Sequence, residues 1–220
     1  MKRIPLGSGA LDELLGGGVE SGSLTLLYGE AGSGKTNMCL QAARNVLETG
    51  KKVALIDCEG VSYERVNQIF GDREDLLKNL LVFQVHSFEE QGDRVGKVAR
   101  MAETRGELGL IIVDSLTVFY RLNLDDHLAR NDFIRQIDTL TETARKMDLP
   151  VIVTSQVYAN INMGGIEFIG GHVLRHNAKT ILKLEPRGKG VRSAVIMKHR
   201  SLPEGRNAMY RITDAGVTDI

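Results

Sequence analysis

Cysteine is nearly absent from this sequence, and several other features are missing with it. Only two cysteines occur in 220 residues, Cys39 and Cys58, and their spacing fits neither a metal-ligand set nor a disulfide framework. No apolar run approaches the length of a transmembrane helix, and residues 1–18 lack the apolar segment of a signal peptide. Repeats, low-complexity tracts and interdomain linkers are also lacking. These absences exclude a disulfide-rich secreted scaffold and a helical membrane protein, so we expect one soluble, cytoplasmic domain with no membrane partner.

Net charge is lacking too, but the charges are unevenly distributed. The chain is 42% hydrophobic and 25% charged, which is typical of a globular protein, and its formal net charge is +0. Residues 170–211 contain ten Lys or Arg against two acidic residues, a net charge of +8, which leaves −8 for the remainder. A basic C-terminal third favours an anionic partner, although a solvated basic surface is the simpler alternative.

The most informative segment is the octapeptide Gly-Glu-Ala-Gly-Ser-Gly-Lys-Thr at residues 29–36. It matches the phosphate-binding P-loop, G-x-x-x-x-G-K-[ST]. Its glycines allow the backbone to turn tightly and to bring N–H groups against phosphate oxygens. Lys35 would supply a cation to the β- and γ-phosphates, and the Thr36 hydroxyl would ligate Mg²⁺. The segment predicts ATP and Mg²⁺ as cofactors, with these residues around the nucleotide: Gly29, Glu30, Ala31, Gly32, Ser33, Gly34, Lys35 and Thr36.

Short apolar runs alternate with helical patterns along most of the chain. The P-loop lies between a strand-like run, 23–28, and a helical segment, 37–49, which is the context that a P-loop requires. Four further apolar runs follow, with helical patterns between them, at 53–57, 81–85, 110–114 and 151–155. This βαβ repetition predicts an α/β fold with a mostly parallel twisted sheet flanked by helices. The last strand-like runs, 179–184 and 192–198, are joined by a hairpin signal and predict antiparallel strands at the C-terminal edge.

Polar residues follow three of these apolar runs. Asp114 ends one run and is expected to hold Mg²⁺ through water. Glu59 follows another and is predicted to activate the attacking water, whereas Asp57 is interpreted as a structural residue at the strand end. Gln156 follows the third and could sense the γ-phosphate. Because parallel strands end at one edge of a sheet, we expect these groups beside the P-loop, with Lys35, Glu59 and Gln156 as the catalytic residues.

The motifs occur in the order found in RecA/RadA-type recombinases. They are LLGGGVE at 14–20, the P-loop, IDCEG at 56–60, LIIVDS at 110–115, TSQV at 154–157, GGHVLRH at 170–176 and LPE at 202–204. The resemblance covers essentially the whole chain, and the last two segments are most similar to RadA and its short archaeal paralogue. It implies a RecA-like P-loop NTPase core, binding to ATP and DNA, and a role in homologous recombination and repair. By this resemblance Glu59 matches the family's catalytic glutamate, and Gln156 matches the glutamine that couples nucleotide to the DNA loops.

The chain departs from that family in its DNA-binding parts. RadA-type recombinases carry an N-terminal helical DNA-binding domain and an aromatic self-assembly motif; we expect neither in residues 1–220, and therefore at most weak homo-oligomers. The first DNA loop, 121–126, has one Arg against Asp125 and Asp126, and the second, 158–169, has no Lys or Arg. DNA affinity rests mainly on neutralised phosphates, so loops this poor in cations predict weak DNA binding.

A further departure is Lys198-His199-Arg200, where RadA-type proteins have a segment resembling Asp-Ser-Pro near the subunit interface that caps ATP. Lys198 could reach the γ-phosphate of a neighbouring subunit, as an arginine finger does. The basic residues could instead bind DNA phosphates, or could only discourage pairing at the edge of the sheet. We favour the DNA interpretation, with these candidate residues: Arg175, Lys179, Lys183, Arg187, Lys189, Arg192, Lys198, His199 and Arg200.

Three functional hypotheses follow. The first is an accessory protein of recombination and repair, a weak ATPase that binds ATP and single-stranded or branched DNA. It would regulate a RadA-type recombinase or a branched-DNA nuclease such as a Holliday-junction resolvase, and the cation-poor loops favour it. The second is an active, filament-forming, DNA-dependent ATPase recombinase. The third is a KaiC-like signalling ATPase, against which the GGHVLRH segment and the basic C-terminal third favour the DNA hypotheses.

Overall fold

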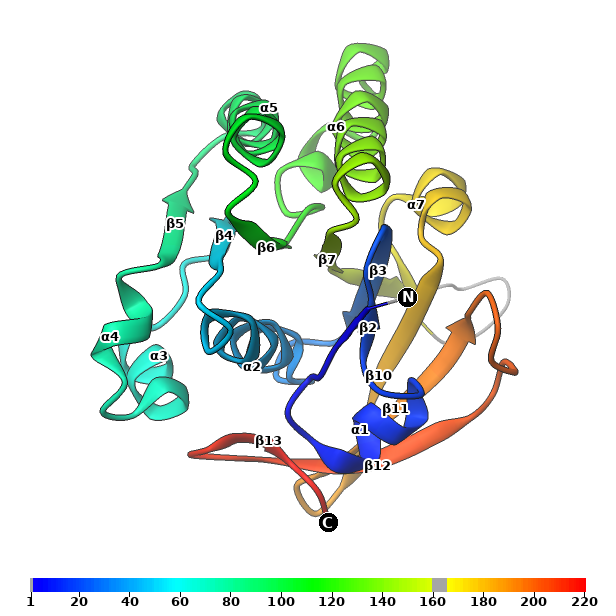
Figure 1. Ribbon diagram of the computed structural model, residues 1–220. Coiled ribbons are helices and arrows are strands. Elements are labelled where there is room, and N and C mark those ends of the chain that lie inside the picture. Colours follow the sequence, from blue (N-terminus) through cyan, green and yellow to red (C-terminus); the bar gives the residue numbers. More distant parts are fainter. Residues whose placement is uncertain (1, 160–165) are drawn as a thin grey trace.

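The computed structural model describes residues 2–159 and 166–220, and within them the centre of the fold is a nine-stranded sheet (Figure 1). Its order is β13-β12-β11-β10-β3-β7-β6-β4-β5. The neighbours from β10 to β5 run parallel: β10 (Thr180–Gly188), β3 (Ser23–Gly29), β7 (Pro150–Ser155), β6 (Leu108–Asp114), β4 (Lys52–Asp57) and β5 (Leu80–Gln84). Antiparallel strands extend the sheet beyond β10: β11 (Val191–Lys198), β12 (Asn207–Thr213) and β13 (Gly216–Thr218). The predicted α/β fold with antiparallel strands at the C-terminal edge is therefore confirmed.

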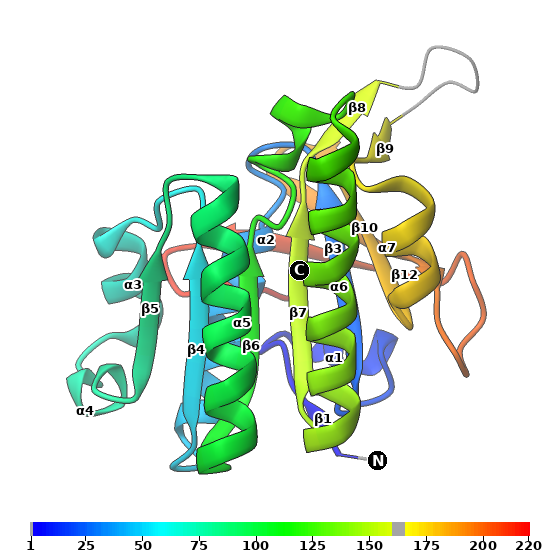
Figure 2. The same ribbon diagram turned by 90° about the horizontal axis from the view of Figure 1, so that it is seen from above.

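Helices cover both faces of this sheet (Figure 1). One face carries α2 (Lys35–Leu47), α3 (Tyr63–Phe70) and α4 (Glu74–Leu77), and the other carries α5 (Phe88–Arg105), α6 (His127–Met147) and α7 (Gly171–Asn177). The short helix α1 (Gly9–Leu14) packs against β12, and a 3₁₀ turn, η1 (Tyr120–Asn123), precedes α6. Figure 2 shows α5 and α6 running alongside the parallel strands. In the described ranges, no helix has the length and apolar character needed to cross a bilayer.

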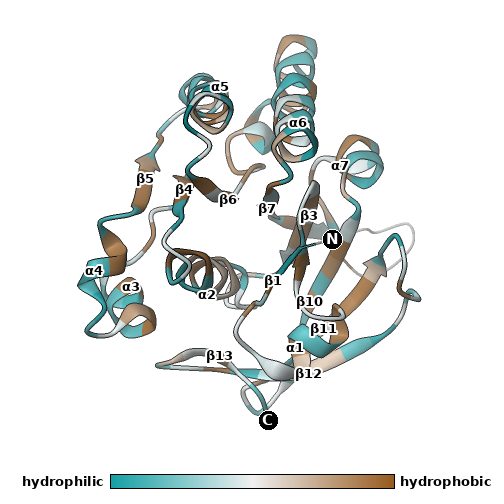
Figure 3. Ribbon diagram, in the orientation of Figure 1, coloured by the Kyte–Doolittle hydropathy of each residue, from teal (hydrophilic) through white to brown (hydrophobic). Residues whose placement is uncertain are grey.

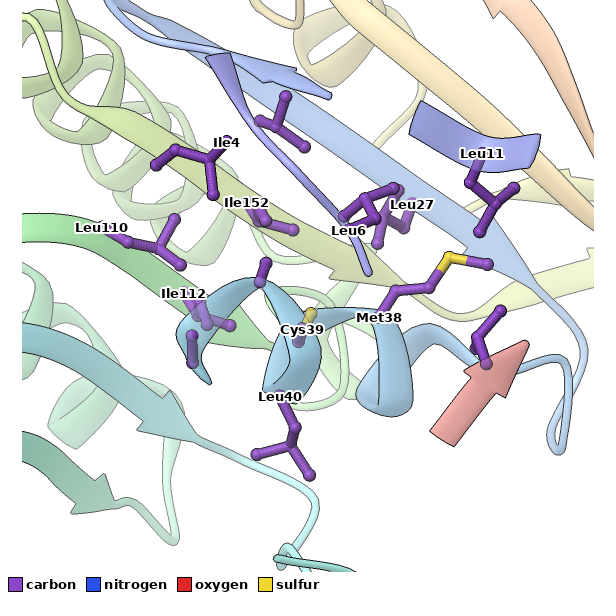
Figure 4. Packing of buried hydrophobic residues seen from close by; sticks show 14 of the residues in the cluster. Ile4, Leu6, Leu11, Leu27, Met38, Cys39, Leu40, Leu110, Ile112 and Ile152 are labelled. Carbon is purple, nitrogen blue, oxygen red and sulfur yellow. The ribbon is translucent and has the colours of Figure 1, made fainter. Parts of the chain in front are cut away.

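The central strands are buried on both faces, which explains why their sequences are continuously apolar rather than alternating. In β6, Leu110 and Ile112 face α2, whereas Ile111 and Val113 face α5 and α6. Figure 4 shows the α2 side of this packing, where Cys39 lies near Ile112, and Figure 3 shows apolar residues concentrated along the strands. Full burial of one such side chain contributes about 1.5–3 kcal/mol to folding stability. The apolar side chains on the two faces of the sheet therefore hold it between its helix layers.

The longer helices begin at residues that suit their first turns. Ser62, Ser87 and Asp126 precede α3, α5 and α6, and each side chain accepts a hydrogen bond from a backbone N–H of the first turn. At the other end of α5, Gly106 adopts the left-handed conformation, with φ of 62°, that commonly ends a helix. These local signals mark where the three helices begin and where α5 ends.

Elements formed by distant or very short segments were not predicted. The chain start pairs as β1 (Arg3–Ile4) with β2 (Val19–Glu20), and the segment 158–169, expected as a DNA loop, contains part of a hairpin, β8 (Val157–Ala159) with β9 (Ile166–Phe168). Residues 160–165 of that loop lie outside the described residues. Strands of two or three residues are too short to show a periodic pattern, so only their tertiary pairing defines them.

Candidate nucleotide-binding site

The candidate site lies where four parallel strands end at one edge of the sheet. The P-loop follows β3, and its neighbours across the sheet are the ends of β7, β6 and β4. Figure 2 shows β4 and β7 pointing to this edge. Ligands of open α/β sheets bind outside the carboxyl ends of the strands, so the fold itself brings the predicted polar residues to one place.

The P-loop backbone has a shape that only a glycine-rich segment adopts easily. Gly32 and Gly34 have φ values of 73° and 103°, where a side chain would be strained. Gly34 immediately precedes α2, so the N-terminus of that helix and its favourable dipole face the loop. Successive backbone N–H groups in such a turn form a concave anion-binding nest, which is the geometry that phosphate groups require.

Lys35 lies inside this loop and is 9% exposed. Its Nζ donates hydrogen bonds to the carbonyls of Gly29, at 2.9 Å, and Glu30, at 3.0 Å. Burial lowers the pKa of Lys35, while the carboxylates of Glu59 and Asp114 act in the opposite direction. Within residues 2–159 and 166–220, two carbonyls are the hydrogen-bond partners of this buried cation. A polyanionic ligand would stabilise it further, so the lysine fits a triphosphate.

Asp114 lies beside the loop with its carboxylate held from both sides. Thr36 Oγ1 donates to Asp114 Oδ2 at 2.6 Å, and Thr154 Oγ1, from β7, donates to Asp114 Oδ1. Burial raises the pKa of Asp114, whereas these two hydrogen bonds lower it. Hydroxyl and carboxylate oxygens are the ligands that Mg²⁺ prefers. In the described part of the chain, the Ser33 hydroxyl oxygen is buried without a hydrogen-bond partner, so the site has polar groups to offer a phosphate and its magnesium ion.

Glu59 and Gln156 are hydrogen-bonded to each other. Gln156 Nε2 donates to Glu59 Oε1 at 3.0 Å, and Arg121 donates from its guanidinium to Gln156 Oε1 at 2.7 Å. The backbone N–H of Gln156 donates to Thr117 Oγ1 at 3.1 Å, which fixes the start of the segment after β7. The chain Arg121–Gln156–Glu59 therefore connects the first predicted DNA loop to the predicted general base. Asp57 instead accepts hydrogen bonds from the backbone N–H groups of Gly60 and Val61, a structural role in the turn.

Sequence reasoning did not identify Thr154, Thr117 or the contact of Arg121. Thr154 was part of the TSQV motif, but only the position of β7 beside β6 shows that its hydroxyl holds Asp114. Arg121 was considered only as a cation of a DNA loop, and its bond to a residue 35 positions away has no local signal.

The basic candidates for DNA binding divide between two ends of the β10–β11 hairpin. Strand pairing places Lys198 opposite Ile181 near one end and Arg192 opposite Pro186 near the other. Ile181 and Pro186 are five residues apart on β10, about 17 Å at a rise of ~3.3 Å per residue. We call Arg175, Lys179 and Lys198 the α7 basic group, and Arg187, Lys189 and Arg192 the hairpin basic group.

Several of these cations already have protein partners. Lys198 Nζ donates to the Arg175 carbonyl at the end of α7, at 2.6 Å, and Arg200 pairs with buried Glu20 at 2.8 Å. His199 Nδ1 accepts hydrogen bonds from two backbone N–H groups of the following turn, each at 3.1 Å. In the hairpin group, Glu185 pairs with Arg187 at 2.8 Å and with the neighbouring Lys183 at 2.7 Å. Arg200 and His199 therefore have partners within the fold, at the edge of the sheet opposite the P-loop.

Comparison with known proteins decides the family. The Rad51 family model matches residues 1–220. The chain belongs to the Rad51 family. The DNA repair and recombination protein RadB of Methanococcoides burtonii is 46% identical over 212 residues, which cover 94% of this chain and 93% of that protein. RadB of Archaeoglobus fulgidus is 41% identical, with 97% of each chain covered. The crystal structure of the RadB recombinase superimposes with a TM-score of 0.86 at 36% identity and covers 99% of both chains.

Membership of the Rad51 family confirms the resemblance to RadA-type recombinases and to their short archaeal paralogue. The similarity extends over nearly the full length of the relatives, so it includes the P-loop edge and the C-terminal antiparallel strands alike. These Rad51-family relatives are named as DNA repair and recombination proteins, which sets the class of function to which the site geometry must be fitted.

Proposed function

We propose that this Rad51-family protein is an accessory factor of homologous recombination and DNA repair, built as one RecA-like ATPase core over residues 1–220. It binds ATP, Mg²⁺ and single-stranded or branched DNA, and it hydrolyses ATP slowly. It regulates a RadA-type recombinase or branched-DNA processing by a nuclease such as a Holliday-junction resolvase, and it forms at most weak homo-oligomers. The observation that carries the proposal is the Arg121–Gln156–Glu59 chain, because it couples a nucleotide site to a loop that is poor in cations.

The nucleotide site supplies most of the groups that phosphoryl transfer needs. The N–H groups of residues 32–36 and the Lys35 ammonium hold the phosphates, while Thr36 and Asp114 hold Mg²⁺. In hydrolysis, the attacking water forms a bond to the γ-phosphorus of ATP while the bond to the β-phosphate breaks and ADP leaves. Glu59 accepts the proton of the attacking water, and Gln156 orients the groups around it.

We attribute slow turnover to the hydrogen bond that the general base, Glu59, already accepts from Gln156. The Glu59 carboxylate accepts a hydrogen bond from Gln156, which is itself held by Arg121. The hydrogen bond from Gln156 occupies an acceptor site of Glu59 Oε1 and so competes with the attacking water for that oxygen. We expect hydrolysis to be faster when Gln156 releases Glu59, which couples the rate to whatever contacts Arg121.

The surface of the first DNA loop supports an accessory role over strand exchange. Leu122 and Leu124 are 73% and 53% exposed, and Asp125 and Asp126 follow them. Exposed leucines and carboxylates repel a phosphate backbone or contribute nothing to holding it. The one cation at this loop, Arg121, is engaged by Gln156. Such a loop is poorly suited to hold two DNA strands for exchange.

The first test is ATP turnover of the pure protein with and without single-stranded DNA. We expect turnover below about 0.1 s⁻¹, far below the ~10 s⁻¹ median of enzymes, with less than about threefold stimulation by DNA. Fast turnover stimulated strongly by DNA, with regular filaments in electron micrographs, would instead identify an active recombinase. ATP turnover without any salt-sensitive DNA binding would overturn the DNA-binding part of the proposal and favour a signalling role for the ATPase core.

The second test asks which basic group binds DNA. We expect Arg175→Gln/Lys179→Gln to weaken single-stranded DNA binding at low salt by at least about tenfold, and to reduce the slope of log K against log salt by up to ~1.4. The reason is that three cations lie together at this end: beside partial burial, the charges of Lys179 and Arg175 lower the pKa of Lys198. Arg187→Gln/Lys189→Gln is the matched comparison, because Glu185 already neutralises Arg187. A larger loss for this second pair would move the DNA surface to the hairpin end.

A further inference from the structure

Two side chains of the antiparallel strands contact the P-loop from outside. The Tyr210 hydroxyl, from β12, donates a hydrogen bond to the Ser33 carbonyl at 2.7 Å. Arg192 Nε, from β11, donates to the Gly32 carbonyl at 2.9 Å. Ile212 lies against the third residue of this stretch, since a Cβ placed on Gly34 would be 3.1 Å from its Cδ1. Three consecutive P-loop residues, 32–34, are thus contacted by side chains of β11 and β12, which lie outside the P-loop motif.

Both hydrogen bonds are made to backbone carbonyls of the P-loop. In a phosphate-binding nest these carbonyls must point away from the ligand. An anion binds the N–H groups, so the carbonyls have to point outward, and each needs a partner there when it is buried. Glycines permit this conformation, but they equally permit others, because their φ and ψ are the least restricted of all residues. Hydrogen bonds to the Gly32 and Ser33 carbonyls select one of those conformations.

We propose that Tyr210 and Arg192 are positioning residues that preset the P-loop for nucleotide phosphates. The proposal rests on the proposed ATP-binding function of the same loop. Neither side chain is placed among the groups that hold phosphate, so their effect passes through the loop backbone. They raise the fraction of molecules whose loop is ready to bind, and the apparent dissociation constant varies inversely with that fraction.

The strands that carry these residues are themselves anchored to the helices beside the nucleotide site. We call residues 207–218, which form β12 and β13, the strap; in Figure 1 it passes beneath α2. The Gln41 side chain of α2 exchanges two hydrogen bonds with the backbone of Val217, at 2.7 and 2.9 Å. Arg65 of α3 donates to the Thr213 carbonyl at 2.8 Å. A strap fixed at these points offers Tyr210 a rigid position, and a positioning contact is effective only when its own base does not move.

Tyr210 is well suited to hold a carbonyl permanently. Its side chain is fully buried among the core residues on the α2 face, and burial raises the pKa of Tyr210, so the hydroxyl stays a donor at neutral pH. Arg192 is half-buried and also donates to the Gly190 carbonyl at 2.9 Å, which ties the hairpin turn to the loop. The two contacts differ in charge and burial, so they can be removed separately.

Nucleotide affinity and turnover of Tyr210→Phe and Arg192→Met test this inference. We expect the ATP dissociation constant and KM to rise about five- to tenfold in either variant, while kcat at saturating ATP changes less than about twofold. The reason for the split is that Lys35, Thr36, Asp114 and Glu59 are untouched once the loop is occupied. Tyr28→Phe is the matched control, because it removes a tyrosine hydroxyl one residue before the loop, where the ring contacts Phe168 on the other face of the sheet.

The outcomes separate this inference from the proposed function. Wild-type protein that does not bind ATP overturns the proposed function, and the inference falls with it. Wild-type protein that binds ATP, beside Tyr210→Phe and Arg192→Met variants that melt earlier but bind it equally well, overturns the inference alone and makes both residues merely structural. Weakened affinity in both variants, with normal affinity in Tyr28→Phe and partial rescue by Arg192→Lys, supports it.

Discussion

Lys35→Ala is expected to lose at least about a hundredfold in ATP affinity while keeping its fold. The ammonium is buried in the loop and donates to two carbonyls among the residues that the structure describes, so its charge is available to phosphate oxygens. Charge-assisted hydrogen bonds contribute about 1.5–3 kcal/mol each, and a loss of ~2.7 kcal/mol corresponds to a hundredfold in affinity. The measurement is ATP binding by calorimetry or by displacement of a fluorescent nucleotide, alongside circular dichroism and thermal melting.

The fold should survive this change because burial of the cation is itself unfavourable in the absence of a ligand. Burial lowers the pKa of Lys35, which means that the charged form is destabilised where it lies. Lys52→Ala is the matched control: Lys52 pairs with Glu107 at the start of β4, the edge of the sheet away from the P-loop. Unchanged ATP affinity in Lys35→Ala would remove the P-loop assignment, and equal losses in both variants would point to a general effect of lysine removal.

The architecture could be predicted because its signals are local. Strand, glycine-rich turn and helix occur within residues 23–47, and serine or aspartate caps mark the starts of α3, α5 and α6. The carboxyl-edge rule then brought Asp114, Glu59 and Gln156 to the P-loop without any knowledge of distances. This rule predicts which residues lie near one another but not which atoms bond. In the structure, the three side chains lie together beside the P-loop.

The partners of the basic residues could not be predicted in the same way. Arg200 pairs with Glu20, 180 positions away, and the same holds for Tyr210, which bonds to Ser33, 177 positions away. No periodicity or motif in the sequence indicates contacts between such distant segments. Side chains that look like a basic cluster in sequence can each be satisfied within the fold. Lys198 is the clearest case, because its ammonium lies at the carbonyl end of α7, where a cation is favoured by the helix dipole. Whether it also reaches a neighbouring subunit's phosphate stays a prediction.

Glu59→Gln is expected to reduce ATP turnover by at least about a hundredfold while changing ATP affinity less than about threefold. General-base catalysis contributes roughly 10²–10⁴ in rate, and an amide cannot accept the proton of the attacking water. The substitution preserves the shape of the side chain, and its carbonyl oxygen can still accept the hydrogen bond from Gln156 Nε2. The P-loop contacts that bind the phosphates are untouched. Single-turnover hydrolysis measures the chemical step directly, and equilibrium binding gives the affinity.

Glu64→Gln is the matched control, because Glu64 is exposed on α3 and the change also replaces a carboxylate by an amide close to the site in sequence. Wild-type turnover in Glu59→Gln would mean that another group takes the proton and that the Gln156 bond serves only to order the loop. A loss of affinity equal to the loss of turnover would make Glu59 a binding residue instead. If turnover alone falls, the bond between Glu59 and Gln156 acquires a definite meaning. The group that Gln156 holds is then the base, and we expect whatever draws Arg121 away from Gln156 to change the rate of hydrolysis.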